Sequence, residues 1–195
     1  MKQELQDRGG KTALLVIDVQ NNVVEDGFES QAVVDRIAKV VNAARTASVP
    51  VIYVQHEDDY LAEGTEGWRI RSEVEPIAGE PVVPKRYPDS FADTTLGETL
   101  KKLGIGRLII AGAQSDACIR ATSQSALARG YDLTLVSDAH TTSDQEFDGV
   151  AIPADISVAL INASLPWLLY PNTTSALASH DEVIAGLAVT QERTL

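Results

Sequence analysis

The stretch Ala111-Gly112-Ala113-Gln114-Ser115-Asp116-Ala117-Cys118, which follows the apolar run Arg107-Leu108-Ile109-Ile110, decides the predicted fold of this chain. A short continuous apolar run is typical of a strand that is buried on both faces. Residues 118–130 carry helix formers, apolar spacing and a terminal glycine, which together predict a helix. Cys118 therefore falls at a strand-to-helix turn, where free backbone N–H groups and the helix dipole favour an ionised thiol.

Other apolar runs predict further strands of the same sheet. They occupy residues 12–17, 51–56, 81–84, 131–138 and 175–178, the last as an edge strand. Apolar spacing and capping residues predict helices over 31–48, from Thr94 or Thr95 to about Lys102, over 151–163 and from Ser179 onward. Strands that alternate with helices imply right-handed crossovers and parallel pairing. The predicted class is therefore α/β with a mostly parallel, open sheet.

The composition excludes several functional classes. The 195 residues include 16 basic and 28 acidic side chains, and the formal net charge of -12 opposes binding to nucleic acid or to an anionic membrane. The opening residues 1–10 lack the apolar middle of a secretory signal, and no apolar run approaches bilayer-spanning length. We therefore expect a cytoplasmic protein with one domain, residues 1–195, and no internal disulfide because the chain has a single cysteine.

Three residues of complementary chemistry each lie just past a predicted strand. They are Asp18, Lys85 and Cys118. The carboxyl ends of parallel strands share one edge of a sheet, so residues far apart in the sequence can converge there. A carboxylate that accepts the thiol proton and an ammonium that stabilises the thiolate would together make Cys118 a competent nucleophile.

Each of these residues also has an ordinary structural interpretation. Asp18 would cap the following turn, Lys85 would be a solvated charge, and Cys118 would be an inert core residue. A redox sensor that uses only the thiol is a further alternative.

Four motifs in the right order make the resemblance to a known family specific. The chain resembles the isochorismatase-like cysteine hydrolases from Thr12 onward, and most closely the metal-free branch that contains streptothricin hydrolase. The motifs are Val16-Ile17-Asp18-Val19-Gln20-Asn21; Lys85 with Asp89-Ser90-Phe91 and Thr94-Thr95-Leu96; Gly112-Ala113-Gln114-Ser115-Asp116-Ala117-Cys118; and Gly130-Tyr131 with Ser137-Asp138-Ala139-His140.

The resemblance implies a three-layer α-β-α, Rossmann-like fold and a catalytic triad of Asp18, Lys85 and Cys118. It also implies a non-proline cis peptide before Gln114, with the backbone N–H groups of Gln114 and Cys118 forming an oxyanion hole. The activity that it implies is hydrolysis of a C–N bond in a small amide or lactam through a thioester on Cys118. Two alternatives stay open: an isochorismatase-type vinyl ether hydrolase, and a catalytically silent binding or assembly protein of the same fold.

The resemblance also bears on ligands and partners. Relatives that bind a metal carry a further histidine after the second predicted strand, where this chain has only His56, so we expect neither metal nor cofactor. The acidic residues within 57–66 favour a cationic substrate, and the family implies a homodimer or homotetramer. The residues predicted to bind substrate are Gln20, Val23, Trp68, Tyr87 and Phe91.

Overall fold

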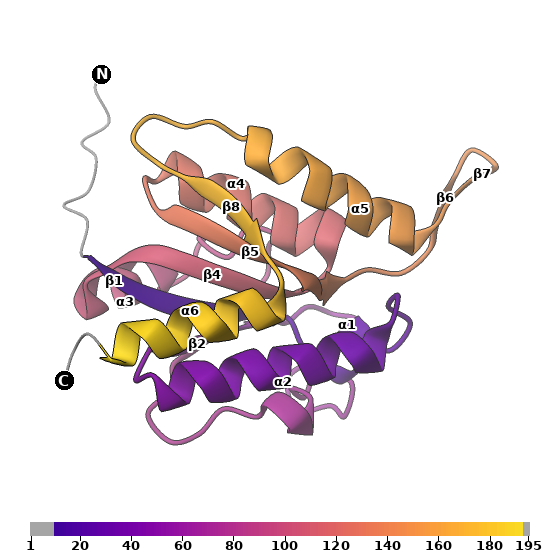
Figure 1. Cartoon of the computed structure of the whole chain (residues 1–195). Helices are drawn as coiled ribbons and strands as arrows, with labels where there is room; N and C mark the ends of the chain where they lie inside the picture. Colours follow the sequence, from indigo (N-terminus) through magenta and orange to yellow (C-terminus); the bar gives the residue numbers. More distant parts are fainter. Residues whose placement is uncertain (1–9, 193–195) are drawn as a thin grey trace.

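The computed structural model describes residues 10–192, and its centre is a six-stranded sheet in the order β3-β2-β1-β4-β5-β8 (Figure 1). All neighbouring strands pair in parallel. The strands are β1 (Lys11–Ile17), β2 (Val51–His56), β3 (Val82–Lys85), β4 (Ile105–Ala113), β5 (Asp132–Thr141) and β8 (Ser175–Ala178). The predicted α/β class with a mostly parallel open sheet is confirmed.

Helices cover both faces of this sheet, which gives the three layers that the resemblance implies. On one face, α2 (Ser30–Thr46) and α6 (His180–Glu192) bury their apolar residues against the strands. On the other face lie α3 (Leu96–Leu103), α4 (Arg120–Ala128) and α5 (Ala154–Ser164). Single turns complete the chain: α1 (Asn21–Val24), η1 (Ser72–Val74), the π-helical η2 (Ser115–Ile119) and η3 (Leu165–Trp167).

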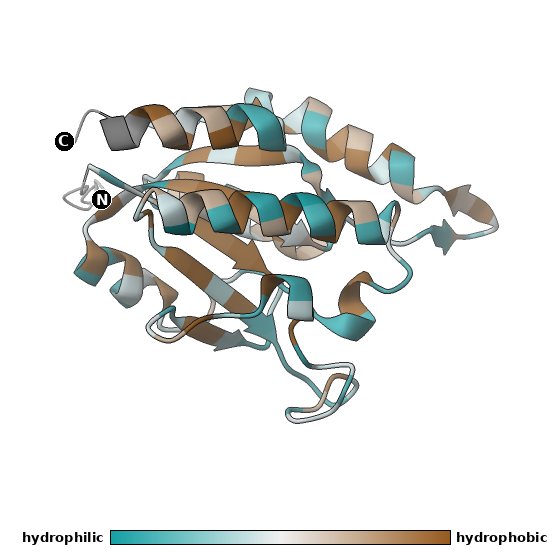
Figure 2. Ribbon diagram, turned by 60° about the horizontal axis from the view of Figure 1, so that its bottom comes forward, coloured by the Kyte–Doolittle hydropathy of each residue, from teal (hydrophilic) through white to brown (hydrophobic). Residues whose placement is uncertain are grey.

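The central strands are apolar along their whole length because they are covered on both sides. Figure 2 shows their hydrophobic ribbons between helices that alternate hydrophobic and hydrophilic residues. Five residues of β1 and eight of β4 are buried, so neither strand offers a solvent-facing side. Continuous apolar sequence is the pattern expected for such strands. Within residues 10–192, no helix combines the length and hydropathy needed to span a bilayer.

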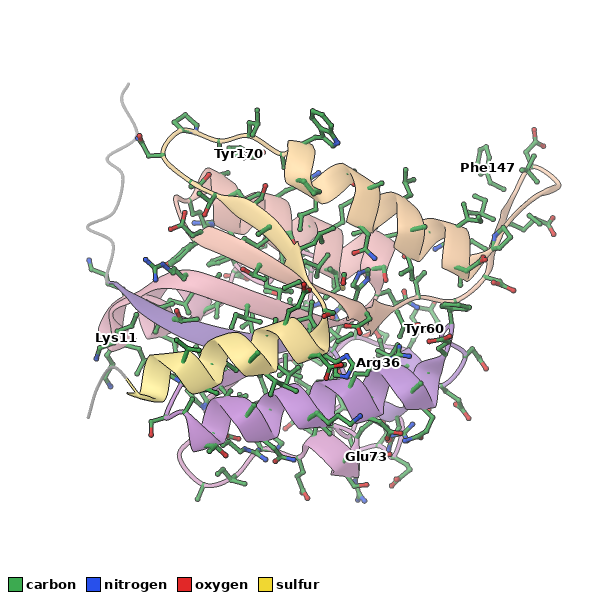
Figure 3. The ribbon with its side chains drawn as sticks, in the orientation of Figure 1. Lys11, Arg36, Tyr60, Glu73, Phe147 and Tyr170 are labelled. Atoms are coloured by element: carbon green, nitrogen blue, oxygen red, sulfur yellow. The ribbon has the colours of Figure 1, made fainter. Side chains whose placement is uncertain are left out.

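The structure corrects the predicted helix over 151–163. A hairpin of β6 (Gln145–Phe147) and β7 (Val150–Ile152) precedes α5, which begins at Ala154 with Pro153 as its N-cap. The hairpin turns at Asp148 and Gly149, both with positive φ, and this dipeptide is a strong turn signal. Phe147 projects from the hairpin into solvent (Figure 3). The sequence around the turn mixes polar and apolar residues over only a few positions, so its pattern does not indicate these two strands.

A glycine fixes how closely β1 and β4 approach at their carboxyl ends. Gly112 has φ +131°, and a Cβ added to it would lie 2.0 Å from the carbonyl oxygen of Ile17. Any other residue would therefore be strained in its backbone and would push the two strand ends apart. Those two ends carry the polar residues described in the next subsection.

We predict that Gly112→Ala lowers the free energy of unfolding by about 2–4 kcal/mol, because backbone strain and steric overlap act together. Urea denaturation measures the change. Gly97→Ala is the matched control, because Gly97 lies within α3 and an added Cβ meets nothing within 4 Å. The control substitution should raise the free energy of unfolding by about 0.5–1 kcal/mol, because alanine has a higher helix propensity than glycine. Equal effects of the two substitutions would show that the close approach is not required.

Candidate active site

Asp18, Lys85 and Cys118 meet at the carboxyl edge of the sheet. Lys85 Nζ lies 2.7 Å from Asp18 Oδ2 and donates a hydrogen bond to Cys118 Sγ at 3.2 Å. The lysine and aspartate side chains are 0% and 1% exposed, and the thiol is largely buried. The convergence that strand order predicted is therefore present.

The strands place each side chain. Asp18 follows β1 with φ 51°, a left-handed conformation that aspartate tolerates better than most residues, and its N–H donates to Val54 O. Lys85 is the last residue of β3 and is paired in register with His56 of β2. Cys118 lies in η2, which follows β4 after Gln114. The strand order β3-β2-β1-β4 brings the three ends together.

His56 joins this cluster, although the sequence alone offered only an isolated histidine. Its Nδ1 lies 3.2 Å from Lys85 Nζ, and its Nε2 lies 3.1 Å from Asp58 Oδ2. An ammonium can only donate, so Nδ1 accepts from Lys85 and the Nε2–H donates to Asp58. That hydrogen bond is the largest influence that holds the pKa of Asp58 below its usual range. Lys85 also donates to Tyr87 O at 3.2 Å.

The electrostatics correct one expectation from the sequence. Burial, and to a lesser extent the nearby Asp18 carboxylate, raise the pKa of Cys118 to about 12, although Lys85 acts in the opposite direction. Burial also raises the pKa of Asp18, against the lowering effects of Lys85 and Cys118. The thiol at the strand-to-helix turn is therefore protonated at neutral pH rather than readily ionised. Desolvation outweighs the opposing effect of Lys85 on the thiol.

The Asp18 carboxylate is short of hydrogen bonds. Among the described residues, no donor reaches either oxygen with good angular geometry, so the contact with Lys85 is a short ion pair rather than a well-aligned hydrogen bond. A buried carboxylate with free acceptor capacity beside a protonated thiol is suited to accept that proton.

The backbone around η2 sets the amide of Cys118 apart from the amides of its two neighbours. The Ala113–Gln114 peptide is cis, as the resemblance implies. The carbonyl of Gln114 accepts hydrogen bonds from the amides of Ala117 and Ile119, each at 3.1 Å. The Cys118 amide lies between those two donors and does not share this acceptor.

Two of the residues predicted to bind substrate have structural contacts instead. Gln20 is fully buried, and its side-chain amide donates to the carbonyls of His56 and Trp68 and accepts from the His56 amide, at 2.8–2.9 Å. Phe91 packs in the core, stacked on Tyr131 with Arg129 over its ring at 4.9 Å. These contacts occupy both side chains.

The other three predicted residues lie in different surroundings. Tyr87 is 53% exposed and adjoins the cluster through its carbonyl, which Lys85 contacts. Trp68 is half-buried; its carbonyl accepts from Gln20 and Gln55, and its Nε1 has no partner among the described residues. Val23 is half-buried against the α2 side of the core. Tyr87, Trp68 and Val23 stay predictions as substrate contacts, as does the expected assembly of copies.

Comparisons with known proteins agree with this fold. The isochorismatase domain family model matches residues 12–154. A putative isochorismatase hydrolase from Oleispira antarctica superimposes with a TM-score of 0.83 at 32% identity, over 95% of this chain and 100% of that one. A parallel sheet layered between helices, with these polar strand ends, defines an isochorismatase-like hydrolase. The chain belongs to the isochorismatase family.

Two curated relatives are similar to this chain over most of its length. An uncharacterised isochorismatase family protein of Bacillus subtilis is 33% identical over 153 residues, which are 74% of this chain and 85% of that protein. A streptothricin hydrolase of Streptomyces noursei is 38% identical over 139 residues, 68% of this chain but only 55% of its own length. The match thus spans about half of that hydrolase.

We predict that Asp18→Asn lowers the pKa of the Cys118 thiol, because the substitution removes the carboxylate that opposes a second negative charge. Ultraviolet absorbance of the thiolate, followed in a pH titration, measures it. The thiolate should form at lower pH than in the wild type. Asp58→Asn is the matched control, since Asp58 touches the cluster only through His56, and it should leave the titration nearly unchanged. A thiolate that forms at higher pH in Asp18→Asn would contradict the assignment.

Proposed function

We propose that the chain is a cysteine hydrolase that cleaves a C–N bond of a small amide or lactam. The observation that carries the proposal is the contact of one buried ammonium, Lys85, with both the Asp18 carboxylate and the Cys118 sulfur. The isochorismatase family and the streptothricin hydrolase among the relatives support it. Hydrolysis of a vinyl ether does not require a thiol held in this way, so the arrangement favours an amide or lactam as the substrate.

In the proposed reaction, Cys118 Sγ attacks the amide carbonyl carbon while its proton passes to Asp18. The S–C bond forms, and the carbonyl electron pair moves to oxygen, toward the backbone N–H groups of Gln114 and Cys118. Asp18 then returns the proton to the leaving nitrogen as the C–N bond breaks. Water, deprotonated by Asp18, opens the thioester and releases a carboxylic acid with the free thiol.

In this scheme, Lys85 stabilises the negative charge before and after the proton transfer. The neutral thiol and the ionised carboxylate carry one negative charge together, and proton transfer merely moves that charge from Asp18 to sulfur. Lys85 contacts both positions, so the charge remains paired throughout the transfer. The raised pKa of the thiol is consistent with attack that is concerted with proton transfer, rather than with a preformed thiolate.

We predict that Cys118→Ala reduces turnover by about a thousandfold or more, because nucleophile and acyl carrier are lost together. A panel of small primary amides and lactams, assayed for released amine or ammonia, measures turnover. Mass spectrometry of quenched wild-type enzyme should show an acyl adduct on the peptide that contains Cys118. Unchanged turnover in Cys118→Ala would overturn the proposed function.

The surroundings of the cluster favour a substrate with positive charge. A cavity of about 370 Å³ beside His56 is lined by Glu57, Asp58, Asp59, Ala62, Glu63 and Arg86. Glu57 is paired with Arg86, and Asp58 with His56. Asp59 and Glu63 are therefore the acidic residues of this cavity that we expect to contact a ligand. We include a cationic group in the proposed substrate class for this reason.

We predict that the double variant Asp59→Asn, Glu63→Gln raises KM for an amide bearing an ammonium group by about two- to fivefold, as expected for exposed charges. The KM for a neutral amide of the same shape should not change, and added salt should shrink the difference. Glu98→Gln, an exposed acid on α3, is the control. Equal changes for charged and neutral amides would remove the cationic substrate from the proposal.

A further inference from the structure

A second chain of buried polar groups lies next to η2, outside the Asp18, Lys85 and Cys118 cluster. Ser115 Oγ lies 2.8 Å from His140 Nδ1, and His140 Nε2 lies 3.0 Å from Asn162 Oδ1. Asn162 Nδ2 donates to the carbonyl of Ser137 at 2.9 Å. Ser115 and His140 are 0% and 1% exposed, so these two side chains are out of contact with solvent, and Asn162 and Ser137 are half-buried.

The partners fix the direction of every hydrogen bond in this chain. Because the Asn162 amide nitrogen donates to Ser137 O, its Oδ1 faces His140 and must accept from the Nε2–H. His140 Nδ1 is then the acceptor in the neutral ring, and the Ser115 hydroxyl donates to it. Burial lowers the pKa of His140, in agreement with a neutral ring.

Ser115 is not a second nucleophile, despite its contact with a histidine. Its side chain is fully buried, so no substrate carbonyl can reach Oγ. Buried polar groups are costly unless they are satisfied, and a satisfied network holds its members in one arrangement. The effect of this chain is therefore to hold the first residue of η2 in place.

An irregularity in β5 supplies two of the four groups. Ile110 pairs with Leu135 and Gly112 pairs with His140, so residues 136–139 of β5 lie opposite Ala111 alone. This bulge brings His140 level with the end of β4 and turns Ser137 O toward Asn162. Bulges beside active sites commonly re-aim a side chain in this way.

The bulge is also held from the opposite face of the sheet. Asp138 accepts from the backbone N–H of His180 and contacts its ring, at 2.8 and 2.6 Å. Arg36, labelled in Figure 3, donates to the carbonyl of Asp138 at 3.1 Å. Residues from α2, α6 and α5 thus fix the bulge, and the bulge holds η2 through His140.

We propose that His140 is a positioning residue: with Asn162 it anchors Ser115, which lies between Gln114 and Cys118, and thereby sets where the amides of those two residues meet the oxygen of the reacting carbonyl. The inference rests on the proposed cysteine hydrolase function. A displacement of about 1 Å at such donors can cost roughly a hundredfold in rate. Loss of the anchor should therefore impair steps that develop an oxyanion more than steps that need only the sulfur.

Two reagents separate these steps. Acetylation by p-nitrophenyl acetate forms an S–C bond to the carbonyl carbon and expels p-nitrophenolate, while the thiol proton passes to Asp18; an oxyanion develops on the way. Alkylation by iodoacetamide forms an S–C bond at the methylene carbon and expels iodide, while the thiol proton again passes to Asp18, and no oxyanion develops. Both reactions report on Cys118 in the intact chain, and neither needs the natural substrate.

We expect Ser115→Ala to slow acetylation by about tenfold or more while alkylation changes little. Ser123→Ala is the matched control, because Ser123 is a buried serine of α4 whose Oγ has no partner among the described residues. Ser115→Thr keeps a hydroxyl and should restore much of the acetylation rate. Circular dichroism and urea denaturation confirm that each variant folds.

Asn162→Asp adds a readout that a purely structural role would not change. A carboxylate next to Nε2 stabilises the charged imidazole, so the acetylation rate should show an additional dependence on pH near neutrality, beyond that of the wild type. This variant keeps the oxygen that accepts from His140, and therefore tests the anchor even if Ser115→Ala folds poorly.

The outcomes distinguish the two proposals. Equal slowing of acetylation and alkylation in Ser115→Ala, or no slowing of either with an unchanged pH profile in Asn162→Asp, would overturn the positioning role. A wild-type chain that is alkylated at Cys118 but never acetylated, and that turns over no amide, would instead overturn the proposed function itself.

Discussion

The ion pair between Lys85 and Asp18 is the constraint on which the rest of this site depends. Both side chains are buried, and transferring two charges from water costs several kcal/mol per ion unless close partners compensate. The partners of Lys85 come from β2, from the segment after β3 and from η2, so the charge is satisfied only when these strand ends meet. Gly112 permits that meeting because its missing side chain lets β4 approach Ile17.

Burial also determines whether the shared proton lies on the Cys118 sulfur or on the Asp18 carboxylate. Desolvation raises the pKa of Cys118 to about 12 and also raises that of Asp18, while Lys85 lowers both. A site with one ammonium can stabilise one negative charge well and a second one poorly. In the proposed reaction, the proton therefore stays on sulfur until the thiol attacks an acyl carbonyl.

Much of the fold and of the polar cluster could be predicted from the sequence, because both depend on local pattern. Buried parallel strands are continuous apolar runs, and Asp18, Lys85 and Cys118 were recognisable as polar residues at their ends. The roles of Gln20 and Phe91 were not predictable, since which way a side chain points depends on contacts with segments remote in sequence. His140 was visible only as the end of a family motif, and its contact with Ser115 was not predictable, because a bulge in β5 moves it into register with Gly112 and no sequence pattern indicates a bulge of that length.

Two amide side chains give the site its rigidity from opposite sides. Gln20 ties the segment after β1 to the carbonyls of His56 and Trp68, and Asn162 ties α5 to the β5 bulge. Each satisfies backbone groups that would otherwise be costly to bury, Gln20 beside His56 and Asn162 beside His140. An apolar core can repack after small changes, but a network of polar groups placed this way cannot, because a hydrogen bond weakens when its atoms move by a fraction of an ångström. The strand ends around Cys118 are accordingly the part of this fold where position is specified most narrowly.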